Sequence, residues 1–162
     1  MTKFSLSALS AAGFEGWLPF DRLLETDPCP QGGGVYVVTL TSRGDPRFSA
    51  KSCGGWFKGK DPTVPMEALS ANWVKGAETV YIGKADNLRR RLREFAKFGG
   101  GHPIGHWGGR LIWQLENCSD LQVAWKLTPG LNPLSVEAQM LSDFRAEYGK
   151  PPFANDPHRL GG

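Results

Sequence analysis

The chain has 162 residues, of which 40% are hydrophobic, and a formal net charge of +3. This length is enough for one domain with a buried core and too short for two comfortable ones, so we expect a single domain over residues 1–162. No apolar run approaches the length of a membrane span, and we expect a soluble chain with no membrane partner. Three scattered cysteines without CxxC spacing predict neither a disulfide framework nor a thiolate metal site, which fits a reducing cytoplasm.

The N-terminal part is predicted to be helical. Residues 5–28 carry an apolar cluster around Phe14, Trp17 and Phe20, and they form most of an N-terminal helical extension over residues 1–31. Prolines and a run of three glycines end this extension. The next segment, residues 35–40 (VYVVTL), predicts a strand that is buried on at least one face.

Residues 41–78 are predicted to be an insertion. The segment is rich in glycine and proline, has little periodicity, and is too long for a plain connection between neighbouring strands. Its aromatic residues can fold it onto the domain, while Lys51, Lys58 and Lys60 give it a basic surface.

Residues 79–98 predict a strand, a tight turn at Gly83 and a basic helix that starts at Asp86 or Asn87. Residues 84–97 contain six basic and two acidic residues, a concentration of charge that is typical of a polyanion-binding surface. At about 100° per residue, Arg91 borders the buried face of the helix. The other arginines point outward and suit solvent or phosphate contact: Arg89, Arg90 and Arg93.

The last two elements are a strand and a helix. Residues 121–127 alternate apolar and polar side chains, which predicts a third strand with one wet face. Before it, Pro103 and several glycines keep His102 and His106 off a common helical face, so a zinc site there is not expected. Residues 132–148 predict a helix with Pro133 at its first position.

Glu137 falls in the middle of the apolar stripe of that last helix. A carboxylate on a buried face costs several kcal/mol unless it is paired, hydrogen-bonded, protonated or bound to a metal. One interpretation is a buried ion pair with Arg91 or Arg110. The other is a cation-binding carboxylate that lines a cleft between this helix and the sheet.

Five elements in this order resemble the GIY-YIG nuclease superfamily, and the match runs from Gly34 to Asn155. They are Gly34-Val35-Tyr36, Tyr81-Ile82-Gly83, an arginine eight residues later, a helical glutamate, and a terminal Pro-Phe-Ala-Asn. Segments such as GFEGWLPF and HWGGRLIWQL also resemble free-standing bacterial members of the superfamily. The resemblance implies an α/β (α+β) fold, in which helices flank a small three-stranded antiparallel sheet.

The resemblance also implies hydrolysis of a DNA phosphodiester with Mg²⁺, or Mn²⁺, as cofactor. By position, Glu137 would bind the metal, Arg91 would hold the scissile phosphate, and Tyr36 and Tyr81 would line the position of the nucleophile. Lys84 matches the residue after the glycine in excision-repair members, and Asn155 matches the asparagine that closes the site. Further basic residues would contact DNA: Arg89, Arg90, Arg93, Lys97, Lys58 and Lys60.

The main hypothesis is therefore a metal-dependent DNA endonuclease that acts in repair, restriction or element mobility. Its target choice would come from the insertion, from residues 99–110, or from a partner protein. The alternative is a nucleic-acid-binding module that keeps the fold and has lost turnover. Phe95 favours the alternative, because relatives often carry a histidine or tyrosine at that position; His102 or His106 would have to compensate.

Overall fold

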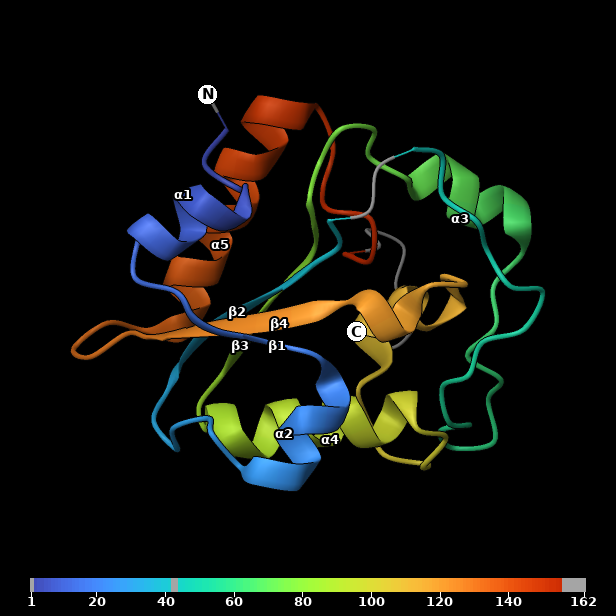
Figure 1. The fold of residues 1–162 in the computed structure, drawn as a ribbon, viewed down its shortest axis with the longest axis horizontal. Helices are drawn as coiled ribbons and strands as arrows, with labels where there is room; N and C mark the ends of the chain where they lie inside the picture. The colour runs from blue at the N-terminus through green and yellow to red at the C-terminus, as the bar shows by residue number, and fades with distance from the viewer. Residues whose placement is uncertain (1, 42–43, 156–162) are drawn as a thin grey trace.

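The computed structural model describes residues 2–41 and 44–155, and its fold belongs to the α+β class. Residues 1, 42–43 and 156–162, which the predicted domain boundaries include, lie outside the described residues. A four-stranded antiparallel sheet in the order β1-β4-β2-β3 forms the centre (Figure 1). Its strands are β1 (Glu15–Leu18), β2 (Gly34–Thr39), β3 (Thr79–Ala85) and β4 (Gln122–Leu127).

The sheet has four strands and not the three expected, because the N-terminal segment, predicted to be helical, also contains the strand β1. A short helix α1 (Leu6–Ala11) leads into β1, and α2 (Phe20–Thr26) follows it. The strand is short and irregular: its register shifts between Gly16 and Leu18, and Trp17 has a φ of 56°. Gly16 packs against Trp125 so closely that a Cβ would lie 2.5 Å from the indole ring. A four-residue strand with this backbone has no two-residue hydrophobic period, so the sequence carries little signal for it.

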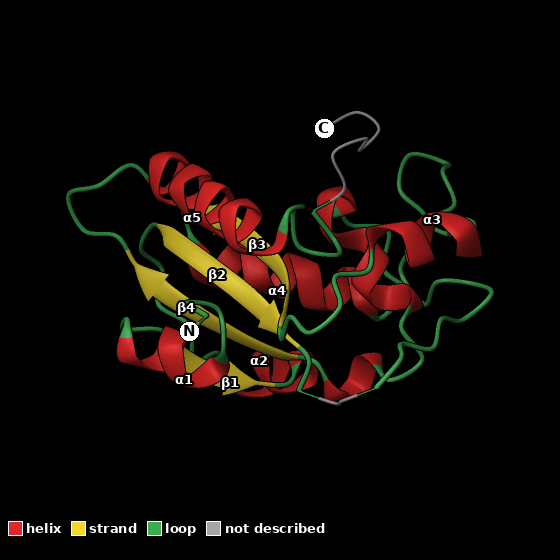
Figure 2. Ribbon diagram, turned by 90° about the horizontal axis from the view of Figure 1, so that it is seen from above, coloured by secondary structure: helices red, strands yellow, loops and turns green. Residues whose placement is uncertain are grey.

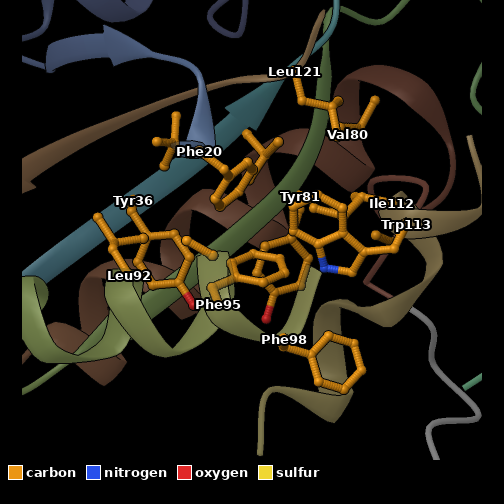
Figure 3. Close-up of a cluster of buried hydrophobic side chains, with 14 of the residues drawn as sticks. Phe20, Tyr36, Val80, Tyr81, Leu92, Phe95, Phe98, Ile112, Trp113 and Leu121 are labelled. Carbon is orange, nitrogen blue, oxygen red and sulfur yellow. The ribbon is translucent and has the colours of Figure 1, made fainter. Parts of the chain in front are cut away.

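Helices cover both faces of the sheet (Figure 2). Along β2, Val35 and Val37 point to one face, where they share a core with α1 and with α5 (Pro133–Tyr148). Tyr36 and Val38 point to the other face, where α2, α4 (Leu88–Gly99) and the 3₁₀ segment η1 (Trp107–Gln114) build the larger, aromatic-rich core (Figure 3). The strand is buried along its whole length because it has a core on each side.

Both long helices begin as their sequences predict. The Asn87 side chain accepts a hydrogen bond from the backbone N–H of Arg90 at 3.1 Å, which caps α4. In the same way, the Asn132 side chain accepts from the backbone N–H of Leu134 at 3.0 Å and caps α5. The start of α4 is thereby fixed directly after β3. The expectation of a tight turn at Gly83 is wrong: β3 continues through Gly83, which pairs with Tyr36, to Ala85, and the bend before α4 lies at Asp86 and Asn87.

The segment between β2 and β3 contains a helix, α3 (Met66–Asn72), and packs against η1 and the C-terminal segment. The buried Gln114 side chain holds it, accepting from the Val64 N–H and donating to the carbonyl oxygens of Val64 and Ser49. Phe48 and Trp73 pack on Phe153, at ring centroid distances of 5.7 and 5.3 Å. These contacts fix the inserted segment beside the sheet.

Among the helices of the described part of the chain, none combines the length and the apolar character that crossing a membrane requires.

Candidate active site

A cleft of about 590 Å³ opens where β3, α4, α5 and the loop before η1 meet. Five of the six residues that the resemblance implies as catalytic line it: Tyr36, Tyr81, Lys84, Arg91 and Glu137. Arg90 lines it as well, together with two further carboxylates, Asp86 and Glu94. The cleft therefore combines phenol, guanidinium, ammonium and carboxylate groups, a set that can bind a phosphate and a cation side by side.

The first tyrosine, Tyr36, lies under the cleft because its cross-strand neighbour is a glycine. Tyr36 in β2 pairs with Gly83 in β3, and a Cβ at Gly83 would lie 2.4 Å from the tyrosine Cζ. Any side chain at Gly83 would push the ring away. Figure 3 shows Tyr36 and Tyr81 beside Phe95 with their hydroxyl groups directed to the same side of the cluster.

Tyr36 forms a buried hydrogen bond with His106. The Tyr36 Oη and the His106 Nε2 are 2.7 Å apart, and the two residues are 1% and 0% exposed. The imidazole stacks on Phe95 with ring centroids 3.5 Å apart and an angle of 5° between the planes. Phe95 therefore supports the histidine that contacts the tyrosine. The hydroxyl can donate to this nitrogen or accept from it, depending on the imidazole tautomer.

The surroundings keep both members of this pair neutral. Burial raises the pKa of Tyr36 well above its ordinary value, and the neighbouring Tyr81 raises it further, while the Arg91 guanidinium acts in the opposite direction. Burial, and then the positive charge of Arg91, lower the pKa of His106 well below its ordinary value. An imidazolium at His106 is therefore disfavoured, so this histidine is poorly suited to be the final acceptor of a proton.

We predict that His106 makes the fold sensitive to mild acid. Because the folded-state pKa of His106 is lowered, only the unfolded chain binds its proton as the pH falls below about 6.5. The free energy of unfolding should then fall by up to about 1.4 kcal/mol per pH unit more in the wild type than in His106→Gln. Denaturant unfolding at several pH values between 7 and 5 measures this. His102→Gln, which changes an exposed histidine, is the matched control and should keep the wild-type slope. Equal slopes in all three proteins would contradict the prediction.

Arg91 borders the cleft as its helical position predicts. Its Nη1 donates to the Gly105 carbonyl oxygen at 2.7 Å and lies 3.4 Å from the Glu94 carboxylate, and its side chain is 34% exposed. The arginine thereby ties α4 to the loop that carries His106. Its charge acts on both Tyr36 and His106, and it lines the open cleft, where a phosphate would bring its negative charge.

Glu137 lines the cleft. The expectation that it lies in the middle of a buried stripe is wrong: Glu137 is only half-buried, Leu134 is 53% exposed, and Phe144 is the buried residue of α5. Val136, Met140 and Leu141 of α5 pack against the core on this face of the sheet, while Leu134 and Glu137 line the cleft. The Glu137 charge is close enough to raise the pKa of Tyr36 slightly, which places the carboxylate near the phenol.

The residues of the cleft fit a Mg²⁺ ion whose coordination comes mostly from water and substrate oxygens. Within residues 2–41 and 44–155, no group of three or more histidine, cysteine or acidic side chains is arranged to hold a metal ion. Mg²⁺ commonly binds through one or two carboxylates and completes its coordination with water and phosphate oxygens. The half-buried Glu137 on a cleft wall supplies one such carboxylate, and zinc-like coordination by protein side chains alone does not fit.

Asn155 does not line the cleft. Its side chain accepts from the Ile82 N–H at 2.9 Å and donates to the Ile82 carbonyl oxygen at 2.8 Å, so both ends of the amide bind the outer edge of β3. This contact holds the C-terminal segment against the strand that carries Tyr81. The observed geometry supports a structural role for Asn155 and gives no direct contact with the cleft.

The remaining basic residues fall into two groups. Arg89 and Arg93, which the helical wheel predicts to point outward, contact the segment around α2. The Arg89 Nε donates to the Cys29 carbonyl oxygen at 2.8 Å, and Arg93 pairs with Asp27 at 2.9 Å. Arg90 is exposed and lines the cleft, whereas Lys58 and Lys60 in the inserted segment are exposed and do not line it. Lys58 lies over the Phe57 ring, which lines the cleft, while Lys97 is half-buried near the end of α4.

His106 is the site residue that the sequence leaves unassigned. It follows α4 through a glycine-rich loop, where neither helical nor strand periodicity places a side chain. The sequence signal is indirect: Phe95 stands where members of the superfamily that the chain resembles often carry a histidine or tyrosine, and a histidine occurs shortly afterwards. The stacking of His106 on Phe95 links these two observations.

Comparisons of this chain with protein-family models, with curated proteins and with solved structures find no match.

Proposed function

We propose that this protein is a metal-dependent DNA endonuclease with a GIY-YIG-like site, and that Mg²⁺ or Mn²⁺ supports its reaction. The observation that carries the proposal is the cleft in which Tyr36, Tyr81, Lys84, Arg91 and Glu137 come together from three separate parts of the chain. Each of these side chains has an ordinary structural use when taken singly. A shared, polar, solvent-open cleft is the arrangement that phosphodiester hydrolysis needs.

The residue roles in this proposal are those that the resemblance implies. Glu137 would hold the divalent ion, which would supply Lewis-acid stabilisation of the charge that develops on the phosphate. Arg91, which lines the same cleft, would bind the scissile phosphate, and Lys84 and Arg90 would add positive charge along the DNA backbone. A tyrosine hydroxyl that has lost its proton can accept one from the attacking water. Tyr36 and Tyr81 both reach the cleft, and of the two we propose Tyr36 as that base because its hydroxyl contacts His106.

His106 is a positioning residue in this proposal. A phenolate at Tyr36 would accept a hydrogen bond from the Nε2–H of a neutral imidazole, which stabilises the anion without charging the histidine. The reverse arrangement, in which His106 takes the tyrosine proton, would create an imidazolium that burial and Arg91 both disfavour. His106 therefore orients the ring and favours the phenolate.

A direct assay tests the proposal. Purified protein is incubated with supercoiled, branched and single-stranded DNA, in separate reactions that contain Mg²⁺, Mn²⁺ or a chelator. We expect strand cleavage with either metal and none with the chelator. Cleavage that persists in chelator, or that Glu137→Gln does not affect, would show a contaminating or different nuclease and refute the site assignment.

We predict that His106→Leu lowers the single-turnover rate about tenfold, the effect of one lost hydrogen bond to a charged group. His106→Gln, which keeps a donor, should retain more of the rate.

The wild-type rate should rise with pH, since burial raises the pKa of Tyr36 and the active form is deprotonated. Single-turnover rates at several pH values measure both effects. In a Tyr36→Phe background, His106→Leu should have no further effect; an equal loss in both backgrounds would show that His106 acts elsewhere.

The alternative is a nucleic-acid-binding module without turnover, and one observation favours it. Tyr36 is 1% exposed and its pKa is raised mainly by burial, which makes it a weak base unless ligands lower the pKa. Such a module would bind DNA with a steep salt dependence. It would leave every substrate intact in the metal series, and Glu137→Gln would not alter its affinity.

A further inference from the structure

Two cysteines that lie far apart in the sequence meet at the surface. Cys53 belongs to the inserted segment and Cys118 begins the short 3₁₀ turn η2 (Cys118–Asp120). Their sulfur atoms are 4.0 Å apart, although 65 residues separate them along the chain. Cys53 is exposed and Cys118 is half-buried, so small molecules in solution can reach the pair.

Both cysteines are attached to the same rigid element. The backbone N–H of Cys53 donates to the Trp113 carbonyl at 3.2 Å, and its thiol lies 3.5 Å from the same oxygen. The backbone N–H of Cys118 donates to the Leu115 carbonyl at 3.2 Å. Trp113 lies in η1 and Leu115 directly follows it, so the two sulfur atoms are held side by side by neighbouring backbone groups. Side-chain rotation and a small shift can bring them to the bonding distance of about 2.05 Å.

The pair is also chemically asymmetric. The contact with the Cys53 thiol lowers the pKa of Cys118 to about 7. The same interaction, with burial, raises the pKa of Cys53. This asymmetry favours Cys118 as the attacking thiolate and Cys53 as the resolving thiol beside it.

We propose that Cys53 and Cys118 form a redox-reactive dithiol site that hydroperoxides oxidise to a disulfide. The Cys118 thiolate attacks the terminal peroxide oxygen, forming a sulfenic acid and releasing an alkoxide that takes up a proton. Cys53 then loses its proton and attacks the Cys118 sulfur; the S–S bond forms and hydroxide leaves as water. In total, two thiols and one hydroperoxide give one disulfide, one alcohol and one water. A dithiol reductant restores the starting state.

The disulfide would fix the inserted segment beside the cleft. Two residues after Cys53, the Gly55 N–H donates to the Phe98 carbonyl at 2.9 Å, and a Cβ on Gly55 would lie 1.9 Å from the His102 carbonyl oxygen. Farther along, Phe57 lines the cleft and contacts Gly105. The segment that Cys53 anchors therefore rests on the loop that leads to His106. A covalent link to Cys118 would reduce the freedom of that segment in the unfolded and locally open states.

The third cysteine provides an internal control. Cys29 is 2% exposed, and burial raises the pKa of its thiol to about 12. It should neither react with peroxide nor exchange with the pair. Serine variants at Cys29, Cys53 and Cys118 separate the three thiols, since each replaces one sulfur by a similarly small polar atom.

The test uses the full-length reduced protein and hydrogen peroxide as the probe. After brief oxidation at pH 7, unfolding and alkylation, we expect a mass loss of about 2 Da, a peptide linked through Cys53 and Cys118, and an alkyl label on Cys29 alone. The oxidised protein should melt about 10 °C higher, because the link closes a long loop, and added dithiol should reverse the shift. The Cys29→Ser variant should behave as the wild type does.

Three results would overturn the proposal. The first is a treated wild type that keeps three alkylatable thiols. The second is a Cys118→Ser variant whose Cys53 is oxidised as fast as in the wild type. The third is accumulation of sulfinic acid at Cys118 with no linked peptide. None of these measurements involves DNA, so they test the dithiol site independently of the proposed nuclease activity.

Discussion

Glu137→Gln is expected to lower metal-dependent DNA cleavage by at least about 10³-fold, because the amide keeps the shape of the side chain and removes the charge that holds the cation. The half-buried position of Glu137 on the cleft wall means that the change removes no core packing. The thermal midpoint should therefore stay within a few degrees of the wild type. Single-turnover cleavage of labelled DNA at saturating protein, with Mg²⁺ titrated, measures the effect.

Glu94→Gln is the matched control for this variant. Glu94 also lines the cleft and has its carboxylate 3.4 Å from the Arg91 guanidinium, so its substitution removes a nearby negative charge without removing the proposed metal ligand. It should leave most of the cleavage rate. If Glu137→Gln unfolds the protein, or if both variants lose activity equally, Glu137 has a structural or general electrostatic role and the metal assignment fails.

Arg91→Ala is expected to lower the single-turnover rate about 10²- to 10³-fold, the usual cost of removing a group that stabilises charge in the transition state. Arg90→Ala changes a second arginine on the same cleft and should mainly weaken DNA binding and reduce its salt dependence. Rates at saturating DNA, with affinities measured at several salt concentrations, separate the two effects.

Arg91 also holds the Gly105 carbonyl, so the alanine variant needs a structural check. Arg91→Lys keeps a positive charge and a donor and should preserve the loop better than it preserves the fork-shaped phosphate contact. We therefore expect the lysine variant to fold as the wild type does and to remain slow. Full activity in Arg91→Lys, or equal losses of rate in Arg90→Ala and Arg91→Ala, would contradict the assignment of Arg91 to the scissile phosphate.

Regular elements were predictable because their patterns are local. The existence of β4, the position of Arg91 and the helix starts at Asn132 and at one of the two expected residues, Asn87, follow from periods and capping rules that act over a few residues. The wet face expected for β4 is wrong: Ala124 is fully buried under a second core, and Leu127 is 42% exposed. The strand β1 was missed because its conformation depends on a distant partner: the backbone at Gly16 and Trp17 bends around Trp125, more than 100 residues away. Local propensity contains no information about that contact.

The residues of the candidate site also differ in how far the sequence predicts them. Helix geometry singles out Arg91 and Glu137 from the sequence, whereas Tyr36, Tyr81 and Lys84 were expected only from the resemblance to the GIY-YIG superfamily. His106 could not be predicted, because its place depends on a loop whose path is set by the Arg91–Gly105 hydrogen bond and by stacking on Phe95. The helical wheel predicts that Arg89 and Arg93 point to solvent, because it considers α4 alone. In the structure, α2 and the residues after it lie beside this face of α4 and supply partners for both arginines.

The contact between Asn155 and Ile82 also covers an edge of the sheet at which strands of two molecules could pair. As the last strand in the sheet order, β3 has an outer edge that could template a strand from another molecule. Asn155 occupies both the donor and the acceptor of Ile82, and the Ala154 N–H takes the Val80 carbonyl at 2.8 Å. The C-terminal segment thus blocks the edge without adding a strand. Loss of that segment would leave the Val80 and Ile82 backbone groups open to intermolecular β-pairing, so the residues that close the fold also protect it from aggregation.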